Sequence, residues 1–96
     1  MDIYARIAEK RGEIFSLAER SGIKNIRIFG SVARREARAG SDVDFLVEFP
    51  PGTSLLSHAA FQRELSEILG CAVDVASING IKQGIKETVM QEAVPL

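Results

Sequence analysis

The sequence predicts an α/β fold of the α+β type, in which helices cover one small mixed β-sheet. Two observations lead to this prediction. Some segments have apolar residues at helical spacing, and the segments between them have apolar residues in alternation or in a short run. Their order along the chain, α-β-α-β-α-β-α, is typical of a mixed sheet covered by helices. With 96 residues the chain can build one core but not two, so we expect a single domain over residues 1–96.

The first half of the chain predicts a helix, a strand and a second, shorter helix. Apolar residues at roughly helical spacing, separated by charged residues, indicate the first helix. Ser21-Gly22 ends this helix, because glycine tolerates the left-handed conformation that is common after helices. Gly30-Ser31 interrupts the strand, and the next helix starts from that turn. The expected elements are a helix over residues 2–19, a strand over residues 26–29 and a helix over residues 32–38.

The second half predicts two strands and two helices. Apolar residues alternate along the next strand until a Pro-Pro-Gly segment stops it. Thr53 or Ser54 can cap the following helix, and Gly70 ends it. The apolar segment AVDVA and a final stripe of apolar residues at helical spacing complete the chain. The expected elements are a strand over residues 42–49, a helix up to residue 69, a strand over residues 72–76 and a helix over residues 81–93.

Three carboxylates are the candidate catalytic and metal-binding residues. Asp42 and Asp44 are two positions apart on a strand, so both side chains leave the same face, roughly 6–7 Å apart. Two such carboxylates repel each other unless a cation lies between them, and hard oxygen ligands suit Mg²⁺ or Mn²⁺. Asp74 lies between two valines, where burying a carboxylate is costly unless it is paired, protonated or bound to metal. If the strand of Asp74 lies beside that of Asp44, the three groups converge and can hold two metal ions.

The turn before the carboxylates is the candidate nucleotide-binding element. Gly30 at a strand-to-helix turn lets backbone N–H groups approach a phosphate, and Ser31 adds a hydroxyl. Arg34 and Arg35, one turn further on, can reach anionic oxygens. Each signal also has a simpler reading: a polar strand start, an edge-strand aspartate facing water, a common Gly-Ser turn or a solvated helix face. The joint pattern of Gly-Ser, a ten-residue gap, Asp-x-Asp and a third Asp is more specific than any of its parts.

The segment FGSVARREARAGSDVDFLVEF resembles the Gly-Ser and Asp-x-Asp pattern of the polymerase-β-like nucleotidyltransferases. The short chain is similar to the minimal nucleotidyltransferase (MNT) type, and the resemblance extends to FQRELSEILG, AVDVA and IKETVMQEAVPL. It implies a polymerase-β-like nucleotidyltransferase core with a triphosphate, two metal ions and a three-carboxylate site. The implied roles fall on Gly30 and Ser31 for the triphosphate, on Asp42 and Asp44 for both metals, and on Asp74 as the third carboxylate.

The same resemblance implies a partner and a reaction. MNT proteins are commonly encoded beside a HEPN protein, an RNase toxin, and act as its antitoxin by binding it and transferring AMP from ATP to one of its tyrosines. The resemblance therefore implies Mg²⁺, with Mn²⁺ as an alternative, ATP as substrate, and a HEPN-type toxin as partner. Arg35 departs from the family, which usually has glycine at this position, and this side chain either crowds the nucleotide pocket or adds a phosphate contact.

Two other functions stay open at this point. The chain can be an antitoxin that blocks its partner sterically with little turnover, or a nucleotidyltransferase that acts on a small molecule or a nucleic-acid end. The formal net charge of −1 disfavours nucleic acid as a direct ligand, because nonspecific binders usually carry a positive excess. The sequence leaves open a homo-oligomer or a hetero-oligomer with the toxin.

Composition excludes several classes of site. No apolar run approaches the roughly 20 residues of a membrane span, and the charged N-terminus does not resemble a signal peptide, so we expect a cytoplasmic protein. Cys71 and His58 are the only residues of their kinds, which excludes a disulfide framework or a Cys/His metal cluster within the chain. We expect Cys71 to pack as a buried small hydrophobe and His58 to lie on the surface of a helix.

Overall fold

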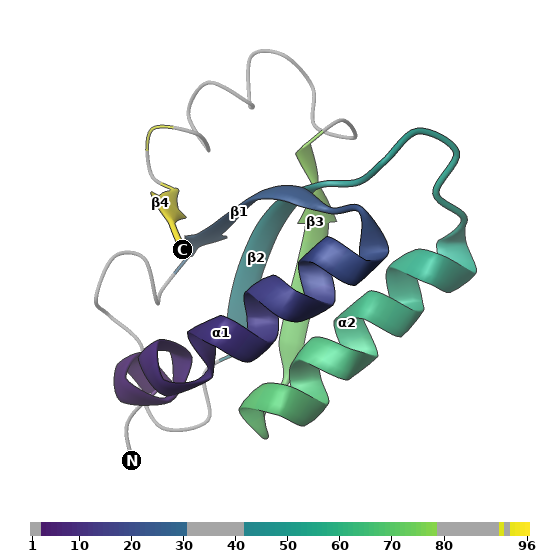
Figure 1. The fold of residues 1–96 in the computed structure, drawn as a ribbon. Coiled ribbons are helices and arrows are strands. Elements are labelled where there is room, and N and C mark those ends of the chain that lie inside the picture. The colour runs from purple at the N-terminus through teal and green to yellow at the C-terminus, as the bar shows by residue number, and fades with distance from the viewer. Residues whose placement is uncertain (1–2, 31–41, 79–90, 92) are drawn as a thin grey trace.

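A computed structural model describes residues 3–30, 42–78, 91 and 93–96 of the protein (Figure 1). The helix expected over residues 32–38 lies outside the described residues, as does nearly all of the helix expected over residues 81–93. The described elements are, in chain order, α1 (Ile3–Ser21), β1 (Lys24–Phe29), β2 (Val43–Glu48), α2 (Leu55–Leu69), β3 (Val73–Ser77) and β4 (Val94–Pro95). Neither described helix is long and apolar enough to cross a membrane.

The strands form one mixed sheet in the order β3-β2-β1-β4. Strand β1 is antiparallel to both β2 and β4, whereas β2 and β3 are parallel. A parallel pair needs a crossover connection, and α2 supplies it between β2 and β3. The mixed sheet and the helix-strand order of the described elements confirm the predicted fold class. Strand β4 was not predicted, because two residues that include Pro95 carry no strand pattern.

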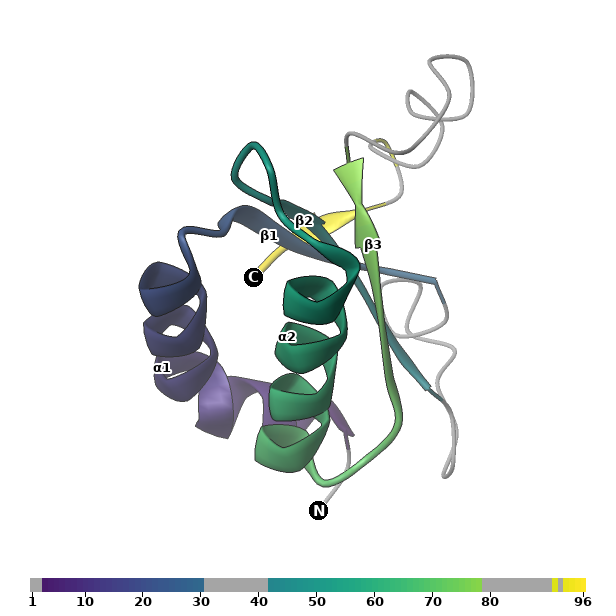
Figure 2. The same cartoon turned by 90° about the vertical axis from the view of Figure 1, so that its right-hand side faces the viewer.

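Both described helices pack on the same face of the sheet (Figure 2). The alternation in β2 explains this arrangement, because Val43, Phe45 and Val47 are fully buried and point towards the helices. Strands β1 and β3 add their own alternate residues to this layer. The core consists of Ile7, Ile14, Leu17, Ala18, Ile23, Ile26, Ile28, Val43, Phe45, Val47, Phe49, Phe61, Leu65, Leu69, Val73 and Val75.

The C-terminal end of α1 is closed by a Schellman motif. Gly22 has a φ of 71° and donates its N–H to the carbonyl of Glu19 at 3.2 Å, and the N–H of Ile23 reaches the carbonyl of Ala18 at 2.9 Å. The expected end of this helix at Ser21-Gly22 is therefore confirmed. Ile23 is itself a core residue, so the motif leads the chain directly into β1.

The ends of α2 place β3 beside β2. Ser54 is the N-cap, because its hydroxyl accepts the N–H of Ser57 at 3.1 Å. Thr53, the other candidate cap, donates its hydroxyl to the carbonyl of Pro50 at 2.7 Å and so closes the preceding turn instead. At the other end Gly70 adopts the left-handed conformation, with a φ of 69°, as the sequence predicts.

Candidate functional site

Strand register brings two of the three candidate carboxylates side by side. Asp44 of β2 pairs with Asp74 of β3 in the parallel ladder, and with Phe29 of β1 in the antiparallel one. Neighbouring strands lie about 4.8 Å apart, and directly paired residues project from the same face of a sheet. Asp42 immediately precedes β2 and is exposed. The strand of Asp74 therefore lies beside that of Asp44, which is the condition that the sequence argument set for convergence of the carboxylates.

The carboxylates project from the face of the sheet opposite α1 and α2. Val73 and Val75 are buried against the helices, so Asp74 between them points the other way. Asp74 is exposed and Asp44 is half-buried. The sequence argument that burial of Asp74 calls for a compensating cation is therefore wrong, because solvent reaches this side chain. Its pairing with Asp44, and not burial, is what links Asp74 to the candidate site.

The donor set suits a hard cation that shares its ligands with a substrate. Among the described residues, no three carboxylate, histidine or cysteine side chains lie close enough to form a metal site made of protein alone. Mg²⁺ commonly takes one or two carboxylates and completes its shell with water and substrate phosphates. The adjacent oxygen donors of Asp44 and Asp74 fit a Mg²⁺–nucleotide complex in this way, whereas the structure does not bring Asp42 together with them as a third ligand.

Gly30 brings the turn after β1 into contact with Asp44. Its φ of +76° lies in the left-handed region that disfavours side chains. A Cβ at this position would collide with Oδ2 of Asp44 and lie 3.3 Å from its Cγ. The glycine is therefore required twice, by its backbone conformation and by the carboxylate against it. The carboxylate of Asp44 fills the space that a side chain at residue 30 would need. Ser31, Arg34 and Arg35 lie outside the described residues.

Arg27 also lies on this face, although it was not among the site residues predicted from the sequence. It lies in β1 between the core residues Ile26 and Ile28 and pairs with Leu46 of β2, so it shares the face of Asp44. Its Nη1 atom is buried and has no hydrogen-bond partner among the residues that the structure describes. Leaving a charged donor unpaired in a buried position is costly, so this nitrogen is a cationic donor available to an anion. The sequence contains one signal for this placement: Arg27 stands between Ile26 and Ile28 in a short strand, and this alternation puts its side chain on the face opposite the core.

Cys71 lies two residues before β3, close enough to Asp42 for the carboxylate to influence its thiol. Burial raises the pKa of the Cys71 thiol, the Arg6 guanidinium lowers it, and the Asp42 carboxylate raises it. The net effect keeps the thiol protonated, and a protonated thiol is neither a nucleophile nor a good metal ligand. Cys71 packs against the core as a hydrophobe, as predicted, but it is partly and not fully buried.

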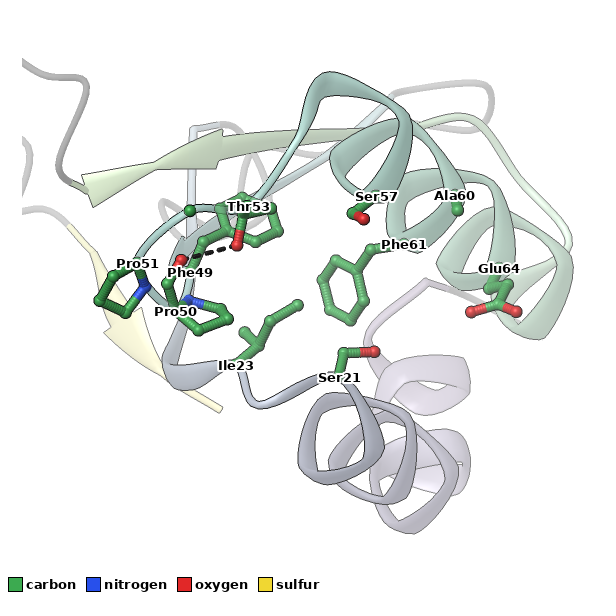
Figure 3. A pocket seen from close by; sticks show the side chains of 11 residues that line it. Ser21, Ile23, Phe49, Pro50, Pro51, Thr53, Ser57, Ala60, Phe61 and Glu64 are labelled. Carbon is green, nitrogen blue, oxygen red and sulfur yellow. Dashed lines mark hydrogen bonds between the residues drawn. The ribbon is translucent and has the colours of Figure 1, made fainter.

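A cavity of about 390 Å³ lies away from the carboxylates, at the other end of β2 (Figure 3). It is formed by the end of α1, the connection from β2 to α2 and the first turns of α2. Phe49, Pro50 and Phe61 line it, and Glu64 is the one charged side chain in the described lining. A hollow whose described lining has a single carboxylate and no cation lacks the groups needed to bind a metal-bound triphosphate. The candidate active site is therefore the open carboxylate face and not this cavity.

Comparison with known proteins agrees with the geometry. The model of the nucleotidyltransferase domain family matches residues 13–96. A relative from Thermococcus cleftensis, named protein adenylyltransferase MntA, is 42% identical over 78 residues, which cover 81% of this chain and 79% of that protein.

Two solved structures share the fold. One, described provisionally as a minimal nucleotidyltransferase, is 43% identical with a TM-score of 0.87 and covers 100% of this chain and 97% of its own. The other is a crystal structure of a toxin–antitoxin with AMP-PNP, which is 17% identical with a TM-score of 0.76 over 88% of this chain and 69% of its own. At that identity the second structure is similar in fold alone.

Proposed function

This chain belongs to the nucleotidyltransferase domain family and is a nucleotidyltransferase, and within that family we propose that it is a Mg²⁺-dependent protein adenylyltransferase that acts as an antitoxin. One observation carries the proposal: Asp44 is in register with Asp74 and in contact with the Gly30 turn. These are the elements that a nucleotidyltransferase needs at one point, namely carboxylates for a cation and a tight turn beside them. Residues 1–96 form one such domain in this proposal, and its location is the cytoplasm.

The proposed reaction transfers AMP from ATP to a tyrosine hydroxyl of a HEPN-type toxin. The tyrosine oxygen forms a bond to the α-phosphorus, the bond from that phosphorus to the β-phosphate oxygen breaks, and pyrophosphate leaves. Asp74 is the best placed group to take up the hydroxyl proton, because it is exposed beside Asp44. Gly30 and Ser31 hold the triphosphate, and Arg34 and Arg35 neutralise its charge in this scheme.

Asp42, Asp44 and Asp74 would hold the two metal ions of this scheme. When bound, the ions neutralise charge on the triphosphate and lower the pKa of the attacking hydroxyl. Asp44 lies on β2 and Asp42 directly precedes this strand, and both would face the triphosphate. Asp74 lies on the neighbouring strand β3 and would face the acceptor. Mn²⁺ offers the same preference for oxygen ligands and would substitute for Mg²⁺.

The partner is supported by the names of similar proteins. The relative called MntA carries the name of a protein adenylyltransferase, and the toxin–antitoxin structure with AMP-PNP has the same fold. An acceptor that is itself a protein also fits the open carboxylate face, because an exposed Asp74 can be reached by a residue on the surface of another protein.

Transfer of label from α-³²P-ATP in the presence of Mg²⁺ tests the proposal. The acceptor is the co-expressed product of the neighbouring gene, and the comparison is between the wild type and Asp42→Asn combined with Asp44→Asn. We expect the double variant to lose label transfer by at least about 10²-fold. Glu48→Gln is the matched control, since it removes a carboxylate from the same strand and face at the far end of β2.

Three outcomes would contradict the proposal in different ways. Inhibition of the partner without label transfer would identify an antitoxin that acts by steric block. Label on a small molecule or a nucleic-acid end, and not on the protein, would identify a different acceptor class. Unchanged transfer by the double variant would show that Asp42 and Asp44 are not part of the site.

A further inference from the structure

Two side chains of α2 bind both backbone polar groups of Val75, the residue directly after Asp74. The N–H of Val75 donates to Oε1 of Gln62 at 2.9 Å, and Nε2 of His58 donates to the carbonyl of Val75 at 2.6 Å. A carbonyl can only accept, so Nε2 carries the proton. Gln62 and His58 are four residues apart on a helix and therefore lie on one face of it. We call this pair of contacts the α2 clamp.

The clamp acts at the free edge of the sheet. Strand β3 is the outermost strand next to β2 in the described sheet, so the outward N–H and carbonyl of Val75 have no neighbouring strand to bind. Unpaired groups at a sheet edge are costly to bury and invite pairing with another chain. The α2 clamp satisfies both groups of this one residue and ties α2 to β3 by hydrogen bonds in addition to apolar packing.

The ring of His58 is held in place by aromatic neighbours. It packs on Phe49 with a centroid separation of 4.7 Å and a tilt of 39°, and Phe49 meets Phe61 edge-on at 6.1 Å. Phe49 and Phe61 are both buried core residues. The prediction that His58 lies on a helix surface is therefore wrong: the side chain is half-buried, stacked and hydrogen-bonded to β3.

The position of the two bonds gives them unequal influence on Asp74. The N–H of Val75 belongs to the peptide group that joins Asp74 to Val75, so Gln62 restrains the peptide plane attached directly to the Cα of Asp74. His58 restrains the next peptide group along the strand. Because side chains alternate across a strand, holding Val75 against the helices holds Asp74 on the opposite face.

We propose that Gln62 and His58 are positioning residues that set the place of Asp74 against Asp44, with Gln62 the more important of the two. The consequence for AMP transfer rests on the proposed function, in which Asp74 serves the acceptor hydroxyl. Neither residue touches substrate in this scheme, and both act through the backbone of Val75. Small displacements of a reacting group are enough to lower a rate by on the order of 10²-fold, so two hydrogen bonds remote from the chemistry suffice.

The test compares Gln62→Met, which keeps the volume but loses the acceptor, with Gln62→Glu, which keeps an acceptor oxygen. Arg63→Met is the matched control, because Arg63 is the next residue of α2 and its side chain is exposed and pairs with Glu67. NMR on the protein alone measures amide exchange at Val75 and the cross-strand NOEs between Asp44 and Asp74. For Gln62→Met we expect Val75 exchange to accelerate by on the order of tenfold and the NOEs to weaken, and for Gln62→Glu we expect wild-type behaviour.

The second arm measures transfer of AMP to the partner under single turnover, together with AMP-PNP affinity. We expect Gln62→Met to lower the transfer rate by about tenfold or more with less than a twofold change in AMP-PNP affinity, and His58→Phe to have a smaller effect. Gln62→Glu should restore transfer, which a general loss of stability would not predict.

The two arms separate failure of this inference from failure of the proposed function. Unchanged NOEs and Val75 exchange in Gln62→Met would overturn the inference whatever the transfer rate. Altered NOEs with wild-type transfer would also overturn it, by showing that the placement of Asp74 does not matter to the reaction. If the wild type transfers no AMP at all, the proposed function fails, while weakened NOEs in Gln62→Met would still support the positioning of Asp74 by the clamp.

Discussion

The two faces of the sheet differ in what they contribute. On the face that meets α1 and α2, alternate residues such as Phe45 are apolar and fully buried. On the opposite face the same strands carry Asp44, Asp74 and Arg27, which are half-buried or exposed, together with Leu46, which is fully buried. Asp44 and Phe45 are neighbours in sequence, yet one faces the candidate site and the other the core. The pleat of a strand therefore separates chemistry from stability within a single residue step.

Truncation on the buried face should give the largest effect on folding. Phe45 has no exposed surface, so Phe45→Ala should lower the free energy of unfolding by about 3–5 kcal/mol through lost burial and the cavity left behind. Phe15→Ala is the control of the same chemistry, because Phe15 is 41% exposed and contacts Arg11 at the surface, and it should cost less than about 1 kcal/mol. Chemical denaturation measures both. Equal costs would show that the helix-covered face does not dominate stability.

Substitution on the open face should instead lower activity and leave stability nearly unchanged. Asp74→Asn should lower AMP transfer by on the order of 10²-fold and leave AMP-PNP affinity nearly unchanged, because Asp74 serves the acceptor and not the ground-state nucleotide complex. Because Asp74 is exposed, the free energy of unfolding should change by less than about 0.5 kcal/mol. Single-turnover transfer with a parallel melt decides this. A wild-type rate would identify Asp74 as a solvent-facing edge residue.

Gly30 should affect both the stability of the fold and the candidate site, because its turn contacts Asp44. Gly30→Ala and the control Gly52→Ala both place a side chain at positive φ, which costs roughly 1–2 kcal/mol. Only at Gly30 would the new Cβ also collide with Asp44, since nothing lies within 4 Å of that position at Gly52. Gly30→Ala should therefore cost more than Gly52→Ala.

A double-variant cycle isolates the contact with Asp44. In an Asp44→Ala background the stability cost of Gly30→Ala should fall to that of Gly52→Ala, with a coupling of about 0.5–3 kcal/mol. AMP-PNP titration of Gly30→Ala should show a larger loss of affinity than the loss of stability measured in a thermal melt can explain. Additive stability costs would mean that Gly30 serves only the backbone of the turn.

Substitution of Arg27 sharpens the definition of the open face. The buried Nη1 atom of Arg27 lacks a partner among the described residues. Replacing this side chain by an apolar one of similar length, in Arg27→Met, should raise the free energy of unfolding by about 1 kcal/mol and weaken AMP-PNP binding about fivefold. Arg63→Met removes an exposed arginine and should change neither quantity appreciably. Unchanged AMP-PNP affinity in Arg27→Met would remove Arg27 from the site.

The strong local signals in the sequence predicted much of the fold. Alternation identified β2, and Gly22 and Gly70 marked the ends of α1 and α2. Strand β1 begins at Lys24, two residues earlier than expected, because an irregular register between Lys24 and Arg27 hides the alternation. The N-cap of α2 could be narrowed only to Thr53 or Ser54, since both hydroxyls can accept the same kind of bond.

The sequence by itself determined which residues are candidates for chemistry and on which side of a strand they lie, because side-chain alternation is a local property of the backbone. It could not determine which strands are neighbours, because pairing depends on the crossover through α2 and on register. Only the tertiary structure placed Asp44 against Asp74 and Gly30, exposed Asp74 to solvent, and put His58 and Gln62 on the backbone of Val75. Contacts between residues 13 or more positions apart, such as the 2.9 Å bond from Val75 to Gln62, arise when the core packs and leave no local pattern in the sequence.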